Sequence, residues 1–95
     1  MSETFTRWDV TDDLHTEEDI RLYLDACSEE DPGDGSLIRA ALNDIARAQK
    51  VSQLARDIGM TREGLYKALG ENGNPSFATV MRITRALGMQ LRITA

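Results

Sequence analysis

The chain of 95 residues has one cysteine, one histidine and few aromatic residues. The single thiol of Cys27 cannot form an internal disulfide, and the single histidine, His15, leaves no pattern for a zinc site. Apolar runs are far shorter than the roughly 20 residues that a membrane span requires, and the residues after Met1 lack the basic start of a signal peptide. We therefore expect one cytoplasmic domain, residues 1–95, that needs no metal, cofactor or membrane.

Catalytic patterns are also missing. The sequence offers no Ser/His/Asp set, no paired buried carboxylates and no glycine-rich phosphate loop. Cys27 falls on the apolar face of a predicted helix and is expected to be a small buried residue, whereas His15 is expected to be exposed. We therefore expect a protein that is not an enzyme.

The charge is divided unevenly along the chain. The formal net charge is −5, which at first argues against a nucleic-acid partner. Residues 1–35 hold twelve acidic side chains and two arginines, a net charge of −10, whereas residues 36–95 hold nine basic and four acidic side chains, a net charge of +5. This asymmetry suggests two different partners.

The acidic part predicts a strand and a helix. Thr4–Val10 is rich in residues that favour strands. Thr16 is a plausible N-cap with Asp19 in the capping-box position, which predicts a helix over residues 17–30. The turn residues 31–35 end it. Its apolar face has helical spacing and comprises Ile20, Tyr23, Leu24 and Cys27.

The basic part predicts four more helices. Ser36 is the expected N-cap of a helix that ends near Gln49, and shorter helices follow over Ser52–Ile58 and from the cap Thr61 to Leu69. Pro75 and Ser76 open the last helix, which Gly88 closes. The strict alternation of Met89–Thr94 predicts a second strand. The side of the last helix that we expect to be buried carries Phe77, Val80, Met81, Thr84 and Leu87.

The segment Val51–Leu69 has the features of a helix-turn-helix. Ala55 supplies a small residue where the two helices touch, and Gly59 tolerates positive φ at the turn. Leu54, Ile58 and Met60 are expected to point inward, as are Leu65 and Leu69. An ordinary helical hairpin is the alternative for this spacing. With its neighbouring helices, the segment predicts a mainly α fold, a five-helix phage-repressor-like DNA-binding domain with short terminal strands.

The second helix of this pair is expected to lie in the major groove, with Arg62 as the main reader of guanine. Thr61 could instead only cap the helix, and Glu63 could only favour its positive end. Gly64 could allow close approach to DNA or to a neighbouring helix. The candidate DNA-binding residues are Ser52, Gln53, Thr61, Arg62, Glu63, Tyr66, Lys67, Asn72 and Asn74.

Four segments carry a family pattern. They are Asp44-Ile-Ala-Arg-Ala, Ser52-Gln-Leu-Ala-Arg, Arg62-Glu-Gly-Leu-Tyr-Lys-Ala-Leu and Gly73-Asn-Pro-Ser-Phe-Ala-Thr-Val. With Trp8-Asp9 and Glu18-Asp-Ile-Arg-Leu-Tyr-Leu, the chain resembles the addiction-module antidote family, the HigA-like antitoxins, over nearly its whole length. The loop 31–35 is the least family-like part. The resemblance implies a partner toxin of the RelE/ParE fold, its inhibition by direct binding, and repression of the shared operon.

The acidic residues 1–35 offer a surface for such a basic toxin. The alternative is a solvated acidic coat that keeps the protein soluble. Trp8 could be an anchor for the toxin or a core residue. The candidate toxin-binding residues are Trp8, Asp12, Asp13, Glu17, Glu18 and Tyr23.

Three hypotheses follow. The first is an antitoxin of a type II toxin–antitoxin module that binds its toxin and operator DNA. The second is a plain transcriptional repressor without a toxin, and the third is a protein-binding module that has lost DNA binding. A single recognition helix reads few base pairs, so we expect a homodimer on double-stranded operator DNA.

Overall fold

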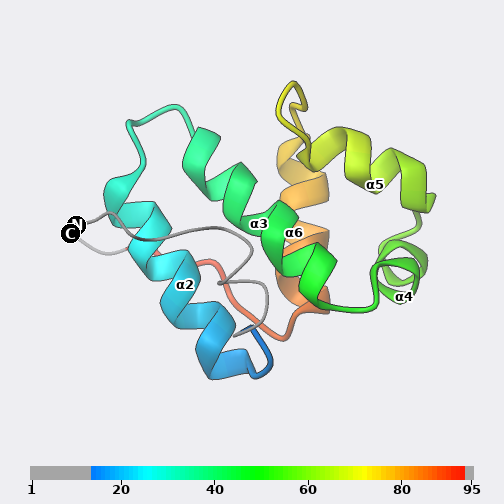
Figure 1. The fold of residues 1–95 in the computed structure, drawn as a ribbon, viewed down its shortest axis with the longest axis horizontal. Coiled ribbons are helices and arrows are strands. Elements are labelled where there is room, and N and C mark those ends of the chain that lie inside the picture. The colour runs from blue at the N-terminus through cyan, green and yellow to red at the C-terminus, as the bar shows by residue number, and fades with distance from the viewer. Residues whose placement is uncertain (1–13, 94–95) are drawn as a thin grey trace.

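The computed structural model describes residues 14–93, and these residues form five α-helices (Figure 1). The mainly helical class and the helix count predicted from the sequence are confirmed for this part of the chain. The predicted division into 1–35, 36–88 and 89–95 stays a prediction. The helices are α2 (Glu17–Glu30), α3 (Ser36–Ala48), α4 (Val51–Asp57), α5 (Arg62–Leu69) and α6 (Phe77–Ala86).

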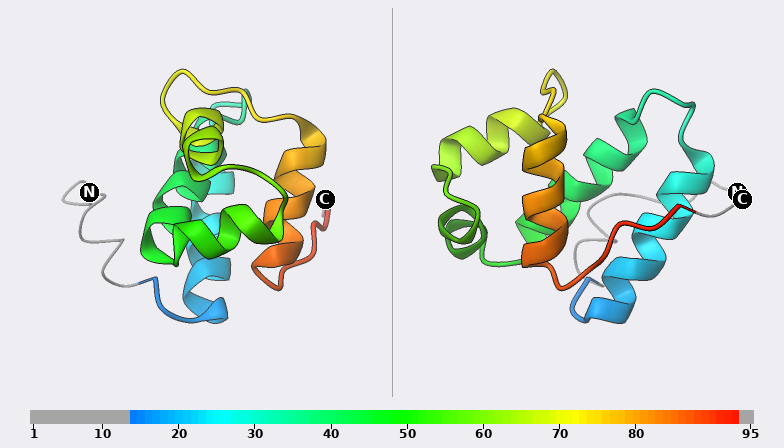
Figure 2. Two further views of the ribbon diagram at one scale, coloured as in Figure 1. Left: turned by 90° about the vertical axis from the view of Figure 1, so that its right-hand side faces the viewer. Right: turned by 180° about the vertical axis from the view of Figure 1, so that it is seen from behind.

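Helix α3 lies at the centre of the molecule, with α2 on one side and α4 and α5 on the other (Figures 1 and 2). Its apolar residues recur at helical spacing, so that Leu42 and Ile45 are buried. One core therefore runs from α2 across α3 to α6. Its largest completely buried apolar side chains are Ile45, Leu65, Leu69 and Ile83.

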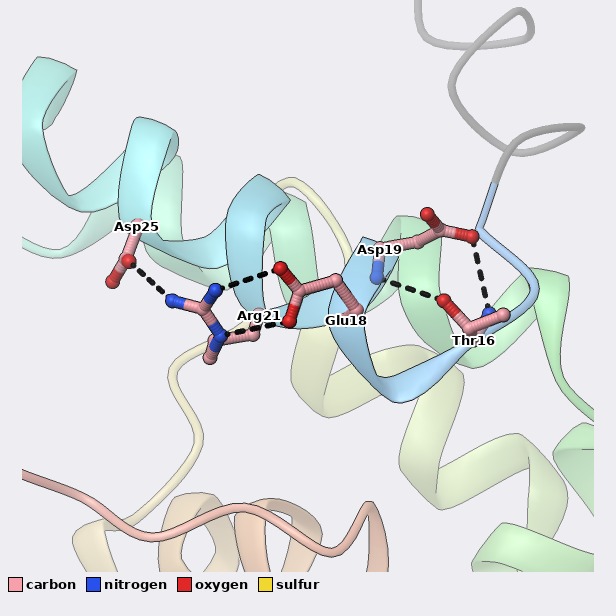
Figure 3. Close-up of polar contacts among 5 residues, drawn as sticks. All are labelled: Thr16, Glu18, Asp19, Arg21 and Asp25. Carbon is pink, nitrogen blue, oxygen red and sulfur yellow. Dashed lines mark hydrogen bonds and ion pairs between the residues drawn. The ribbon is translucent and has the colours of Figure 1, made fainter.

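The predicted start of α2 is confirmed. Thr16 is the N-cap, and its hydroxyl accepts a hydrogen bond of 3.0 Å from the backbone N–H of Asp19. The Asp19 carboxylate in turn accepts one of 3.2 Å from the backbone N–H of Thr16, which completes the capping box (Figure 3). Further along the helix Cys27 is buried, and His15 before it is exposed, as expected.

The predicted N-cap of α3 is wrong. Ser36 is the first helical residue, and Gly35 occupies the cap with φ 79°, a left-handed conformation that glycine adopts at no steric cost. The Asp31 carboxylate supplies the missing acceptor, with hydrogen bonds of 2.8 Å from the N–H of Leu37 and 3.3 Å from that of Ile38. A side chain from the end of α2 thus caps α3, and the intervening loop is ordered by it.

The predicted C-terminal strand is also wrong. Residues 89–93 form neither helix nor strand, and residues 14–93 contain no strand with which they could pair. The segment instead leaves α6, where Met89 N–H donates to the Thr84 carbonyl at 3.0 Å, and runs past α2 (Figure 2). Thr94, like the predicted strand Thr4–Val10, lies outside the described residues.

Helix α6 packs on the core through Val80, Ile83 and Leu87, and only Phe77 of the predicted side is exposed. Phe77 is 72 % exposed because it is the first residue of the helix, at the end farthest from the buried turn around Ile83 and Leu87. Val80, Met81 and Thr84 are half-buried. The buried stripe therefore runs through the second half of the helix, and Gly88 ends it with φ 79°, as predicted.

Within residues 14–93, one charged side chain is completely buried. Asp44 on α3 has 0 % exposure and accepts a hydrogen bond of 2.6 Å from the hydroxyl of Tyr23 on α2. The guanidinium of Arg47, one turn further along α3, donates a second bond of 3.0 Å. A buried carboxylate is tolerated only with such partners, so this contact fixes how α2 rests on α3.

Tyr23→Phe should lower the free energy of unfolding by about 1.5 to 3 kcal/mol, the range for a hydrogen bond to a charged group. Urea denaturation at neutral pH measures it. Tyr66→Phe is the matched control, since no hydrogen bond joins its hydroxyl to another of residues 14–93. Equal stability of the two variants would contradict this role of Tyr23.

The cap of α3 also predicts a pH dependence. Partial desolvation raises the pKa of Asp31, but the backbone hydrogen bonds from Gly35, Gly33, Leu37 and Ile38 outweigh it and hold the pKa below the ordinary 3.8. The ionised carboxylate therefore stabilises the fold above pH 3.8, and this contribution is lost as the pH falls through the lower, folded-state pKa.

We therefore expect the stability difference between the wild type and Asp31→Asn to shrink as the pH falls from about 5 to about 2. Thermal unfolding followed by circular dichroism measures it. Glu30→Gln, at the exposed end of α2, is the control, since no hydrogen bond joins its side chain to another of residues 14–93, and it should change the stability less than Asp31→Asn at neutral pH. A difference that is constant over this range would contradict the role of Asp31.

Candidate nucleic-acid interface

Helices α4 and α5 meet across a tight turn at residues 58–61. Gly59 has φ 77° in this turn, and the N–H of Met60 donates a bond of 2.8 Å to the carbonyl of Ala55. Ala55 is buried, as the small residue at the contact was expected to be. The axes of α4 and α5 cross steeply: in Figure 1, α4 is seen nearly end-on, whereas α5 runs across the view. This is the arrangement that a helix-turn-helix requires.

The buried side of α5 determines which residues it exposes. Leu65 and Leu69, four residues apart, are both 0 % exposed and anchor the helix on the core. Arg62, Glu63 and Lys67 are consequently exposed. The helix therefore presents a polar side to solvent, in the sense predicted from the sequence.

The first turn of α5 is stabilised locally. The Thr61 hydroxyl accepts a bond of 2.9 Å from the N–H of Gly64, so Thr61 is the predicted N-cap. A Cβ on Gly64 would lie 2.9 Å from the same hydroxyl oxygen. The absence of a side chain at Gly64 thus leaves room for the cap, and Thr61 has a structural role whether or not it also contacts a ligand.

Arg62 and Tyr66 are brought together on the exposed side of α5. The guanidinium carbon of Arg62 lies 5.8 Å from the centre of the Tyr66 ring, one helical turn away. Such a cation–π contact restricts the arginine while leaving its N–H donors available. Lys67, the residue that follows Tyr66, is exposed and adds a second positive charge to α5.

The other predicted contacts flank α5. Ser52 and Gln53 are exposed in the first turn of α4, and Asn72 and Asn74 are exposed in the loop between α5 and α6. The side-chain amide of Gln53 already has two partners. It donates a hydrogen bond of 2.7 Å to the carboxylate of Asp57 and accepts one of 3.2 Å from the guanidinium of Arg56. A ligand contact by Gln53 would therefore compete with bonds within α4.

Sequence reasoning missed Arg39 on α3. Its guanidinium donates bonds of 2.8 Å to the carbonyl of Leu69 and 2.6 Å to that of Gly70. The Gly70 carbonyl also accepts a bond of 2.8 Å from the N–H of Gly73. The Leu69 carbonyl ends α5 without a partner within the helix, so Arg39 closes the helix from a neighbouring element. Nothing in the spacing of α3 indicates this, because the contact joins residues 30 positions apart.

Three further arginines gather around one hollow at the surface. A hollow of about 820 Å³ lies between the α4–α5 turn and α6, and it is lined by Arg56, Arg82 and Arg85 together with Asp57. Arg82 and Arg85 form no ion pair within residues 14–93. In the sequence these residues are visible only as part of the charge total, although the i, i+3 spacing of Arg82 and Arg85 indicates a shared face of α6.

Comparison with known proteins identifies the family. Residues 4–95 match the family model described as "Probable addiction module antidote protein". The chain belongs to this addiction module antidote family. It is also 50 % identical over 93 residues to a Haemophilus influenzae protein described as "Uncharacterized protein", with 98 % of this chain and 94 % of that protein covered. No solved structure matches, so the likeness to phage repressors stays a prediction.

The family resemblance predicted from the sequence is thus confirmed at the level of the antidote family. Its predicted toxin contacts are placed in part. Glu17 and Glu18 are exposed in the first turn of α2, whereas the half-buried Tyr23 directs its hydroxyl to Asp44. The other predicted contacts, Trp8, Asp12 and Asp13, lie outside the described residues.

Two kinds of feature are absent from residues 14–93 of this antidote-family chain. No three His, Cys, Asp or Glu side chains gather there in a group that could hold a metal ion. None of the helices in that range combines the length and the apolar composition of a membrane span.

Arg39→Met should release the end of α5 while keeping most of the buried stem. We expect a loss of about 1.5 to 3 kcal/mol in the free energy of unfolding, the range for a hydrogen bond from a charged group. Arg39→Lys should recover part of it, since one ammonium cannot match the guanidinium fork. Urea denaturation measures both. Arg56→Met is the control, and equal losses would contradict the capping role.

Proposed function

We propose that this protein is an antitoxin of a type II toxin–antitoxin module, which neutralises a partner toxin by binding it and represses its own operon through α4 and α5. The observation that carries the proposal is the polar, exposed side of α5 across a helix-turn-helix-like turn in a chain of the antidote family. The protein acts by binding in the cytoplasm, without catalysis.

The DNA-binding part rests on the placement of α5. Leu65 and Leu69 hold one side of the helix in the core, so its opposite side is free to enter a major groove. Arg62 lies in the first turn, where recognition helices approach base edges, and its fork can pair with the O6 and N7 atoms of guanine. Ser52 and Gln53 begin α4, where side chains and backbone N–H groups contact phosphates.

The toxin-binding part rests on charge. Helix α2 carries six acidic side chains and a single base, Arg21. The resemblance implies a RelE/ParE-like toxin, and such toxins are small basic proteins, so an acidic surface suits them. A basic partner gains association rate from these charges and affinity from buried apolar anchors.

The operator is read by a homodimer in this proposal. A single α5 contacts too few base pairs for useful specificity, whereas a twofold dimer reads two half-sites one helical turn apart. Sedimentation equilibrium of the full chain tests this part independently of DNA.

Arg62→Ala should weaken binding to the DNA upstream of the gene by about 1 to 3 kcal/mol and relax the preference at one base pair. Lys67→Ala should weaken binding to specific and non-specific DNA alike, and it should lower the slope of log K against log salt concentration by about 1. Gel shifts at several salt concentrations measure both. Arg92→Ala, an exposed arginine outside α4 and α5, is the control.

Two outcomes would contradict parts of the proposal. Binding of the wild type that is absent at every salt concentration would favour a protein-binding module without DNA recognition. A gel shift without any complex between this chain and the product of the adjacent reading frame would favour a plain repressor.

A further inference from the structure

An open groove separates α2 from the segment that follows α6. It encloses about 980 Å³, and the residues that α2 contributes are spaced at 17, 18, 21, 24, 25 and 28, one continuous stripe along the helix. The opposite wall is residues 88–92, which run past α2 (Figure 2). Apolar side chains line its interior: Leu24, Ile38, Leu42, Val80, Met89 and Leu91.

The rim of the groove on α2 is acidic. Glu17, Glu18 and Asp25 lie along it, and its one base, Arg21, is already bonded to Glu18 at 2.9 Å and to Asp25 at 3.4 Å (Figure 3). Arg92 is the other base at the groove. The groove thus combines an apolar interior with a negative edge, the complement of a segment that has apolar side chains flanked by lysine or arginine.

The wall of the groove formed by residues 88–92 has exposed apolar surface. Leu91 is 55 % exposed although it lines the groove, and Ile93 two residues later is 93 % exposed but does not line it. Within residues 14–93, the backbone of residues 90–93 forms no hydrogen bond to another main-chain group. A ligand in the groove would bury Leu91 and could pair with this backbone.

We propose that this groove is the docking site for the toxin, and that it receives a basic, apolar-anchored segment of that toxin. This inference rests on the antitoxin function proposed above and adds where the toxin binds. A second copy of this chain fits less well. A twofold interface places the same patch on itself, so the acids of one copy would face those of the other.

The test uses the full chain and, as the probe, the product of the adjacent reading frame, mixed in a calorimeter. Leu91→Glu should raise the dissociation constant about tenfold or more, since it places a charge among the buried anchors. Ile93→Glu, the same change outside the groove, should alter it less than about threefold. Both positions are exposed, so the variants should fold like the wild type, which circular dichroism verifies.

A second pair of variants tests the rim. Asp25→Lys should slow association and weaken the complex, most strongly at low salt, whereas Glu29→Lys on the same helix but outside the groove should do so less. Stopped-flow mixing at two salt concentrations separates the two effects. If both variants change the association rate and the affinity equally, the effect comes from net charge alone, and the proposed role of the acidic rim is overturned.

The outcomes separate this inference from the function on which it rests. If the wild type forms no complex with the probe, the antitoxin function and the docking site both fail. If the wild type binds and Leu91→Glu and Asp25→Lys bind equally well, the toxin docks elsewhere and only the groove is overturned. If Leu91→Glu dissociates a dimer without weakening the complex, the groove holds a second copy of this chain.

Discussion

The buried carboxylate of Asp44 is the constraint from which the arrangement of α2 follows. This carboxylate lies on the central helix α3 and is not accessible to solvent, so it requires hydrogen-bond donors from the protein at fixed positions. The Tyr23 hydroxyl at 2.6 Å fixes the rotation of α2 about its own axis. With Tyr23 directed to α3, the neighbouring face of α2, which carries Glu18 and Asp25, is left along the groove. A contact in the core thus sets the orientation of an acidic surface.

Helix α3 extends the same control to the other side of the molecule. Arg39, more than one turn before Asp44, closes the end of α5 through two backbone carbonyls. The positions of the acidic helix α2 and of the exposed basic side of α5 are therefore both set by contacts with the central helix α3. Because packed interiors deform little, a change in α3 should disturb both surfaces together rather than one alone.

Features set by neighbouring residues could be predicted from the sequence, and features set by distant ones could not. The caps Thr16 and Thr61 and the anchors Leu65 and Leu69 depend on spacings of three or four residues. The closure of α5 by Arg39 and the groove join residues far apart in the sequence, and the cap of α3 by Asp31 depends on how the loop of residues 31–35 folds. Met89–Ile93 alternates as a strand should, but a strand requires a neighbour, and residues 14–93 supply none.

The net charge of −5 is compatible with DNA binding because of where the charges lie. Helices α2 and α5 are on opposite sides of α3, whose own diameter with side chains is about 10 Å (Figure 1). The Debye length at physiological ionic strength is about 8 Å, so exposed charges on α2 are largely screened at α5. A DNA duplex placed beside α5, as proposed, would therefore experience Arg62 and Lys67 more than the acids of α2. A fold that separates the two charge groups by one helix can serve partners of opposite sign.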